Sequence, residues 1–292
     1  MRSLVFFILC FVTYTSSESS ANEEFVGWLE KVGIKTAAKI KQAEQHQIFM
    51  QRIVGGAIAP INYHPYLAGL LIDINELQSP AACGGSILTP ASILTAAHCW
   101  FDGRNRAVRF TVVLGTPFLF HGGLRIQASS IAVHHQYDFR TFANDIAMLY
   151  LPRRIIFNHA VQPIPLATDS LLSTDKAGMW AVAAGYGRYS DVINPTTNTM
   201  ARNVFLQTIS LETCRGYYGN VVLDSNICTS GVGGVGICRG DSGGPLTINH
   251  QGKEWLIGVS SFVARDGCEL GFPSVFASVP SFRAWIQHHM IF

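Results

Sequence analysis

Short runs of β-branched and aromatic residues recur from residue 53 to the C-terminus, and Gly, Pro, Asn and Asp separate them. Such runs are typical of strands bounded by turns, and their close spacing predicts an all-β barrel or sandwich. Only the C-terminal segment, from Phe282 to Met290, shows a clear helical period of apolar residues. The strand-like runs include Ser86 to Leu88, Phe110 to Leu114, Met179 to Ala184, Val204 to Ile209 and Trp255 to Ser260.

The N-terminus carries Arg2 and then an unbroken apolar run from Leu4 to Val12. The run is too short to span a bilayer. A basic start, a short apolar core and small polar residues after it are typical of a secretory signal peptide. We therefore expect residues 1–17 to be removed near Ser17 and the protein to be secreted and extracellular. The formal net charge of +2 indicates neither nucleic acid nor membrane as a partner.

Residues 18–52 differ in composition from the chain that follows. Their apolar residues recur at helical spacing, although Gly27 and Gly33 weaken the helix prediction. The segment contains no cysteine, so no disulfide can hold it after a cut, and it ends at Arg52, directly before Ile53-Val54-Gly55-Gly56. The helically spaced residues are Phe25, Trp28, Leu29, Val32, Thr36, Ile40 and Ala43.

Three strings carry residues suited to nucleophilic catalysis. Ser242 stands in the glycine-rich turn from Gly240 to Pro245, His98 ends an apolar run, and Asp145 begins another. A serine hydroxyl becomes a nucleophile only beside a positioned base, and backbone N–H groups in such a turn can stabilise an oxyanion. Taken singly, each string has an ordinary structural explanation: a surface turn for Ser242, a core histidine for His98 and a capping aspartate for Asp145.

Together, in the order His98, Asp145, Ser242, the strings resemble the chymotrypsin-like (trypsin-fold) serine endopeptidases, notably their invertebrate chymotrypsin- and elastase-like members. The resemblance extends over residues 53–292. It implies an all-β protease domain of two six-stranded antiparallel β-barrels with a C-terminal α-helix. The barrels are expected to divide near residues 165–175, with the catalytic residues in the cleft between them.

The resemblance also implies the mechanism. Ser242 attacks the scissile carbonyl while His98 accepts its proton and later protonates the leaving amine. Asp145 holds the other imidazole nitrogen, and the amides of Gly240 and Ser242 bind the oxyanion.

Activation follows from the same resemblance. A trypsin-like protease is expected to cut after Arg52, which makes residues 18–52 an activation propeptide. The new ammonium group of Ile53 would then enter the protein and pair with Asp241, because a buried carboxylate and a buried ammonium are each costly alone.

The chain has seven cysteines, and Cys10 lies in the signal peptide, which leaves an even number. An even number in a secreted chain indicates disulfides. A zinc site is the alternative, but no C-x₂-C spacing supports it. The residues alone leave the connectivity open. The resemblance implies Cys83–Cys99, Cys214–Cys228 and Cys238–Cys268.

The specificity pocket is expected to bind aliphatic side chains. Relatives that cut after Lys or Arg carry an acid six residues before the nucleophile, where this chain has Gly236, followed by the apolar Ile237. The segment expected to form the pocket wall is Ser261-Phe262-Val263, and a valine at its last position narrows the specificity pocket as in elastase-like enzymes. Ser274 stands where some invertebrate relatives place an acid, and Arg239 is expected at the rim. A chymotrypsin-like preference for large apolar or aromatic residues is the alternative.

Neither a metal nor another cofactor is expected. Residues 103–137 contain no Asp or Glu for a calcium site. Pro195 disqualifies the sequon-like triplet that begins at Asn194.

Three roles are open: a digestive or general endopeptidase, a regulatory cascade protease, and a non-enzymatic homologue. A cascade protease often carries a cysteine-rich regulatory domain, and a non-enzymatic homologue has usually lost a catalytic residue. The sequence therefore favours the first role. For this role we expect a monomer whose partners are protein or peptide substrates, an activating trypsin-like protease and protein inhibitors.

Overall fold

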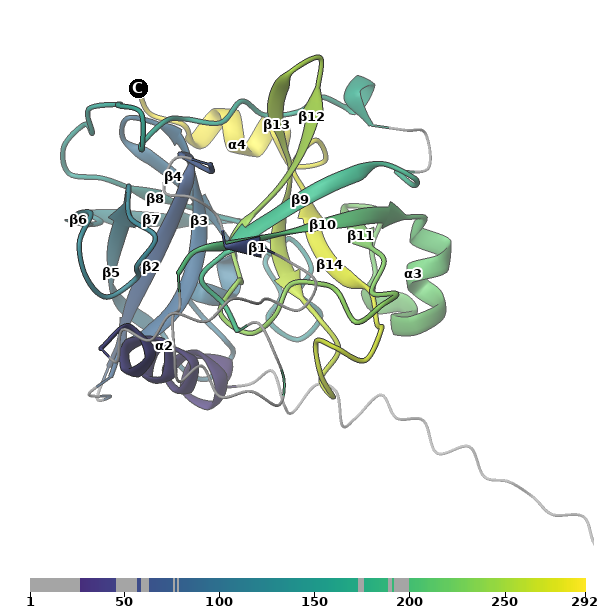
Figure 1. The fold of residues 1–292 in the computed structure, drawn as a ribbon, viewed down its shortest axis with the longest axis horizontal. Coiled ribbons are helices and arrows are strands. Elements are labelled where there is room, and N and C mark those ends of the chain that lie inside the picture. The colour runs from purple at the N-terminus through teal and green to yellow at the C-terminus, as the bar shows by residue number, and fades with distance from the viewer. Residues whose placement is uncertain are drawn as a thin grey trace, which may run out of the picture.

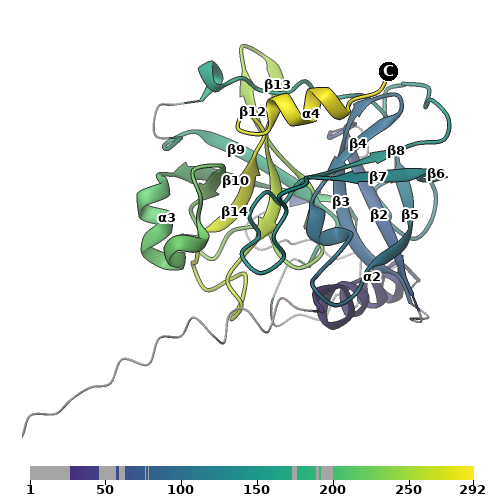
Figure 2. The same ribbon diagram turned by 180° about the vertical axis from the view of Figure 1, so that it is seen from behind.

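The computed structural model describes residues 27–45, 57–58, 63–75, 77, 79–172, 176–188, 191 and 200–292. The predicted signal peptide and the junction between Arg52 and Ile53 lie outside the described residues. Two antiparallel sheets lie side by side, one formed by the first half of the chain and one by the second (Figures 1 and 2).

The first sheet closes into a barrel through one bent segment. Its strand order is β6-β5-β2-β3-β4-β8-β7, so β6 and β7 lie at opposite ends. Only Ala128 and Ser129 separate these two strands in the chain, and taking them as one bent strand gives the predicted count of six. The strands are β2 (Leu67–Ile74), β3 (Ala81–Thr89), β4 (Ser92–Thr95), β5 (Ala107–Leu114), β6 (Leu124–Gln127), β7 (Ser130–Val133) and β8 (Ala147–Tyr150).

The second sheet closes by direct pairing. Its order β10-β11-β14-β13-β12-β9 returns to β10, which pairs with β9, so six strands form a ring. The seventh, β1 (Ala57–Ile58), adds to β10 opposite Asn203 and Arg202. The other strands are β9 (Trp180–Gly185), β10 (Arg202–Ile209), β11 (Asn226–Thr229), β12 (Pro245–His250), β13 (Lys253–Phe262) and β14 (Ser274–Ser278).

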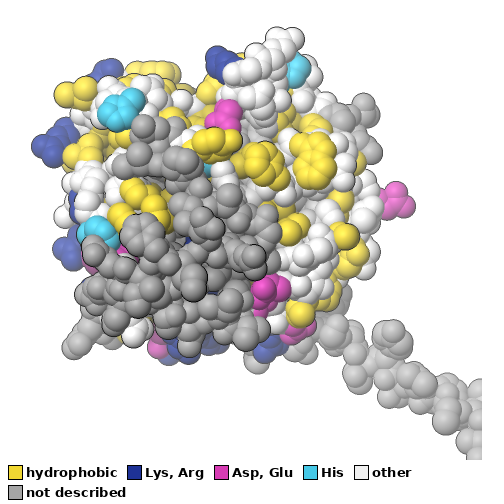
Figure 3. Space-filling model, in the orientation of Figure 1, with side chains coloured by type: hydrophobic (Ala, Val, Ile, Leu, Met, Phe, Trp, Pro, Cys, Tyr) yellow, Lys and Arg dark blue, Asp and Glu magenta, His cyan; other side chains and the backbone are white. Residues whose placement is uncertain are grey.

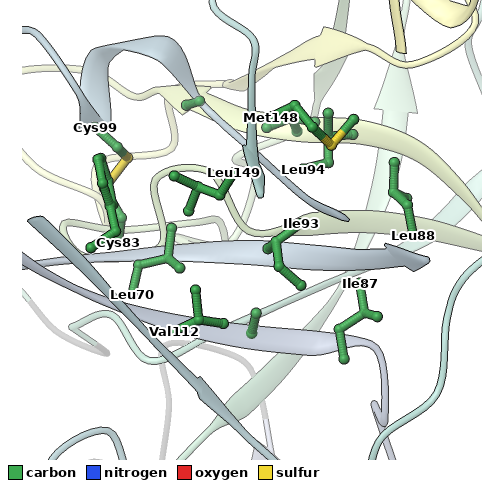
Figure 4. Close-up of a cluster of buried hydrophobic side chains, with 14 of the residues drawn as sticks. Leu70, Cys83, Ile87, Leu88, Ile93, Leu94, Cys99, Val112, Met148 and Leu149 are labelled. Atoms are coloured by element: carbon green, nitrogen blue, oxygen red, sulfur yellow. A yellow bond between two sulfur atoms is a disulfide. The ribbon is translucent and has the colours of Figure 1, made fainter. Parts of the chain in front are cut away.

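The apolar face of each strand fills the barrel interior. In β5, Phe110, Val112 and Leu114 are buried on one face of the strand, while Arg109 is exposed and Thr111 is half-buried on the other, as expected for side chains that alternate across a strand. Figure 4 shows Val112 in a cluster with Leu70, Ile87 and Ile93 of other strands of this barrel, and the Cys83–Cys99 disulfide lies at one side of the cluster. Each fully buried aliphatic side chain contributes about 1.5–3 kcal/mol to stability. The predicted all-β, two-barrel class is confirmed.

Helices lie around the two barrels. The predicted C-terminal helix is confirmed as α4 (Arg283–His289), whose Ile286 packs into the core. The sequence analysis did not predict α3 (Leu211–Tyr218), although Ser210 caps its N-terminus and Gly219 ends it at φ 63°. Short 3₁₀ turns are η2 (Ala97–Cys99), η3 (Asp169–Leu171) and η4 (Gly219–Val221).

The segment before the first barrel is helical as well. A π-helical stretch, η1 (Leu29–Ile34), leads directly into α2 (Lys35–Gln45). Figure 1 shows α2 beside the lower ends of β2 and β3, so this segment lies against the first barrel and not apart from it.

Side chains of both charge signs are interspersed on the face of the molecule seen in Figure 3. Apolar side chains stand among them, over the second barrel in particular. Within the described residues, no helix combines the length and the apolar character needed to cross a membrane.

Candidate active site

Strand pairing in the first barrel sets His98 beside Asp145. β4 pairs with β8 so that Thr95 lies opposite Ala147. His98 follows Thr95 in the short turn η2, and Asp145 directly precedes β8, so both side chains emerge at the same end of the strand pair.

The Asp145 carboxylate is buried and accepts hydrogen bonds from three donors. The backbone N–H of His98 reaches Oδ1 at 2.9 Å, and His98 Nδ1 lies 2.7 Å from Oδ2. The hydroxyl of Ser261 donates to Oδ2 at 2.5 Å. This arrangement fixes the imidazole ring, places the proton on Nδ1 and leaves Nε2 free to act as a base.

The Ser242 loop is held between the two barrels. The N–H of Gly84 in β3 donates to Ser242 O at 2.7 Å, and the N–H of Gly243 donates to Ser260 O in β13 at 2.7 Å. Gly243 has φ 78°, and a Cβ there would lie 2.2 Å from Thr95 Oγ1, so only glycine fits. These contacts from both barrels bring Ser242 to the cavity that His98 also lines.

The predicted oxyanion donors lie in the same loop. Gly240 has φ 103°, a backbone shape that few other residues adopt. Within the described part of the chain, neither the N–H of Gly240 nor that of Ser242 has a hydrogen-bond acceptor.

Most predicted pocket residues line one cavity beside Ser242. They are Ile237, Arg239, Ser261, Phe262 and Val263, and Asp and Glu are absent from the described residues of its lining. Gly236 and Ser274 lie behind this lining, where the buried Ser274 hydroxyl accepts the N–H of Ile237 at 3.2 Å. The guanidinium of Arg239 donates to Arg265 O at 3.1 Å.

Phe142 belongs to the site but was not predicted from the sequence. Its ring centroid lies 5.5 Å from that of His98 and 5.8 Å from that of Phe262, and it lines the same cavity. Its backbone has φ 55°, a left-handed conformation that no feature of the sequence indicates for a phenylalanine.

Asp241, the predicted partner of Ile53, points away from the catalytic cavity. Its carboxylate accepts the N–H groups of Gly187 at 2.8 Å and Cys238 at 2.9 Å. Burial raises the pKa of Asp241 to about 6, although the two backbone N–H groups oppose the shift. Asp241 lines a second pocket together with Arg202 and Asn203 of β10.

Three disulfides are present, in the pairs that the family resemblance implies. Cys83–Cys99 joins β3 to the turn that carries His98. Cys214–Cys228 ties α3 to β11, and Cys238–Cys268 joins the two loops that border the predicted pocket.

Comparison with known proteins places this geometry among proteases. Residues 53–286 match the family model described as Trypsin. The chain is 38% identical over 239 residues to brachyurin from Leptuca pugilator, which covers 80% of this chain and 97% of the relative. It is 33% identical over 239 residues to a collagenase from Hypoderma lineatum, which covers 82% of this chain and 87% of the relative.

Further matches agree. The identity to Trypsin, alkaline B from Manduca sexta is 36% over 245 residues, covering 82% of this chain and 91% of the relative. The solved structure of HL collagenase superimposes with a TM-score of 0.73 at 32% identity, covering 82% of this chain and all of that one, 100%.

Proposed function

The chain belongs to the trypsin family of serine endopeptidases, and we propose that it is secreted as a zymogen, is cut after Arg52 and then cleaves after aliphatic residues. The single observation that carries the specificity is the cavity beside Ser242. Val263 and Ile237 contribute apolar surface to it, and its described lining has no carboxylate.

Ser242, His98 and Asp145 form the proposed catalytic group. The 2.7 Å contact between His98 Nδ1 and Asp145 leaves Nε2 to accept the Ser242 proton as Oγ attacks the carbonyl carbon. The same nitrogen then protonates the leaving amine, and a water molecule repeats the attack on the acyl-enzyme. Asp145 stabilises the imidazolium that forms in each step.

The amides of Gly240 and Ser242 are proposed to bind the developing oxyanion. Loss of one such donor in a comparable site costs about 3–4 kcal/mol of transition-state stabilisation.

The apolar pocket wall favours aliphatic side chains over charged ones. A Lys or Arg side chain would lose its water without gaining a carboxylate, at a cost of several kcal/mol. One methylene in an apolar pocket changes the binding free energy by only about 1–3 kcal/mol, so the preference among Ala, Val and Leu should be graded. Val263 should make Phe and Tyr poorer than Leu because it narrows the wall.

The test compares kcat/KM on peptides that differ only at the residue before the cut. Wild type is expected to prefer Leu, Val or Ala over Phe, with Arg poorest, and Val263→Gly should raise the value for Phe relative to Ala. Val232→Gly, the same change at a valine that is 78% exposed, is the matched control and should leave the ratio unchanged. A wild-type preference for Arg over Leu would contradict the proposal. A Phe preference that Val263→Gly does not alter would favour the chymotrypsin-like alternative.

Activation is proposed to insert Ile53 beside Asp241. β1 pairs with Asn203 and Arg202, which line the same pocket as the Asp241 carboxylate. The four Cα–Cα steps from Ile53 to Ala57 span at most about 14 Å. This reach supports entry of the new ammonium group into that pocket, where it would neutralise the carboxylate.

The proposed role is a digestive or general endopeptidase, with protein and peptide substrates, a trypsin-like activator and protein inhibitors as partners of a monomer. The absence of cysteine from residues 18–52 argues against a disulfide-tethered regulatory domain of the kind that cascade proteases often carry.

A further inference from the structure

Residues 27–45, which we call the cleft segment, lie across the catalytic site. The ring of Trp28 meets the ring of His98 edge-on, with centroids 5.0 Å apart and planes at 84°. Trp28 and Val32 also line the cavity that Ser242 and Val263 line. Trp28 is only 8% exposed, so it occupies space that a substrate would need next to the imidazole.

Both ends of the cleft segment are held by hydrogen bonds to the first barrel. At the start, the N–H of Leu29 donates to Asp102 Oδ2 at 2.6 Å. At the end, the buried carboxylate of Glu44 accepts the N–H groups of Leu119 at 2.5 Å and Phe120 at 2.7 Å. These bonds fix the segment along the cleft, since a buried carboxylate needs such donors.

Between these ends, the cleft segment packs as tightly as a protein core. Ala37 and Ile40 of α2 are fully buried in a cluster that joins both barrels. Gly33 lies so close to β3 that a Cβ would be 2.7 Å from the Cβ of Ala81. The methyl group of Thr36 would lie 2.9 Å from a Cβ at Gly240, so the segment also touches the loop of the proposed oxyanion donors.

Acidic side chains of the segment face basic groups of the first barrel: Glu44 lies 2.9 Å from Nδ1 of His121, and Glu30 lies 3.7 Å from the guanidinium of Arg104. Lys39 has no such partner among the described residues, and burial, with Arg188 and Arg239 nearby, lowers its pKa. Apolar packing, the hydrogen bonds at the two ends and these acidic contacts therefore hold the segment in place.

We propose that the cleft segment is an inhibitor of this protease that remains bound without a covalent link after the cut at Arg52 and blocks the active site until it dissociates. The proposal rests on the proposed function, because it needs an active protease to inhibit. Before the cut, residues 46–52 hold the segment at a high effective concentration. After the cut, binding becomes bimolecular, and dilution should release the segment because no cysteine retains it.

The test uses the full chain with an enteropeptidase recognition site at the junction, made by Ile48→Asp, Phe49→Asp, Met50→Asp, Gln51→Asp and Arg52→Lys, so that enteropeptidase cuts there selectively. Trypsin itself is unsuitable because Lys31 and Lys35 of the segment are exposed. After the cut, kcat/KM on a short peptide is followed as the enzyme is diluted, and size-exclusion chromatography shows whether the fragment elutes with the protease. The parent chain is expected to keep the fragment at high concentration and to gain activity on dilution.

A pair of adjacent alanines supplies the matched variants. Ala37→Glu places a charge in the buried contact, whereas Ala38→Glu places the same charge on the exposed side of the same helix. Cut Ala37→Glu should be fully active at once and lose the fragment, and Ala38→Glu should behave as the parent. Trp28→Ala keeps the helix and removes the ring against His98. It is expected to raise the Kd of the cut fragment for the protease about thirtyfold or more. This variant replaces Ala37→Glu in the test if Ala37→Glu does not fold.

The outcomes separate the two proposals. A parent chain that is fully active immediately after the cut, with the fragment eluting alone, overturns the inhibitor and leaves the protease proposal standing. If neither the parent nor Trp28→Ala turns over any peptide once Ile53 is the N-terminus, the proposed function fails. In that case, co-elution of the fragment with the protease domain would still show that the cleft segment binds.

Discussion

Asp241 accepts two backbone N–H groups, yet burial holds its pKa near 6 in the uncut chain. The unfolded chain ionises this carboxyl near pH 4. Between pH 4 and pH 6 the unfolded state is therefore ionised first, and the folded state loses stability as the pH rises. The loss amounts to at most about 3 kcal/mol for a shift of this size.

The residue-scale prediction is the pH dependence of the stability of the Asp241→Asn variant, made in the uncleavable Arg52→Gln chain. The free energy of unfolding of this variant, relative to its Arg52→Gln parent, should become more positive from pH 4.5 to pH 7.5, because asparagine does not ionise. Urea unfolding at both pH values measures the difference. His64, whose pKa burial lowers to about 4, contributes with the opposite sign but equally in both chains, so it cancels. A difference that does not change with pH would show that the carboxyl titrates normally.

The residues proposed as catalytic could be predicted because three short strings, each with its own local chemistry, occur together and in one order. The glycines around Ser242 are an example, since the close approach at Gly243 excludes any side chain. Phe142 could not be found in this way. Its contact with His98 depends on a left-handed backbone and on Phe262, which is distant in the chain.

At the scale of the element, α3 is a helix that was not predicted, because the pattern of short strand-like runs dominates this part of the chain. Ser210 accepts the N–H of Thr213 at 3.1 Å, and Gly219 ends the helix in a left-handed conformation. Both signals are readable in the sequence. The helix matters for the site because Tyr218 at its end donates to Pro273 O, next to Ser274, and packs against Phe262.

The element-scale prediction concerns this cap. Ser210→Ala removes the acceptor for Thr213 N–H and should lower the free energy of unfolding by about 1 kcal/mol. Ser210→Thr keeps an acceptor and should cost less. Urea unfolding with the disulfides intact, in the Ser242→Ala background to prevent self-digestion, gives both values. Equal stability of Ser210→Ala and its parent would mean that the cap contributes nothing.

For the segment before the first barrel, helical periodicity predicted the helix but not its packing partner. The pattern predicts a helix with an apolar face, and the structure shows η1 and α2 in the described part of that segment. Periodicity does not say which surface covers the face. That surface consists of β3, the loop at Leu119 and the cleft, which only the folded barrels bring together.

At the scale of the whole molecule, the two barrels meet along the site. β3 of the first barrel and β13 of the second both form hydrogen bonds with the Ser242 loop, and β1, which precedes the first barrel in the chain, pairs with β10 of the second. The two-barrel class was predictable from the strand-like runs and the family resemblance. The way in which each barrel closes was not predicted, because it depends on the bend between β6 and β7 and on the pairing of β9 with β10.

Two separate features are proposed to keep the uncut chain inactive. One is the lack of a free Ile53 ammonium group to pair with Asp241 before the cut, and the other is the cleft segment over His98. The first is relieved by one peptide-bond cleavage, whereas the second also requires dissociation. Activity should therefore lag behind cleavage at high protein concentration.

The most direct test of the central claim is covalent labelling of Ser242 with a serine-directed fluorophosphonate, located by mass spectrometry. Once the N-terminus is Ile53, one phosphonyl group should appear on Ser242. It should be absent from Ser242→Ala and strongly slowed in His98→Gln, because the hydroxyl then lacks its base. The uncut Arg52→Gln chain should label far more slowly than the cut chain. A label on another residue, or an alanine variant that labels as fast as wild type, would show that Ser242 is not the nucleophile.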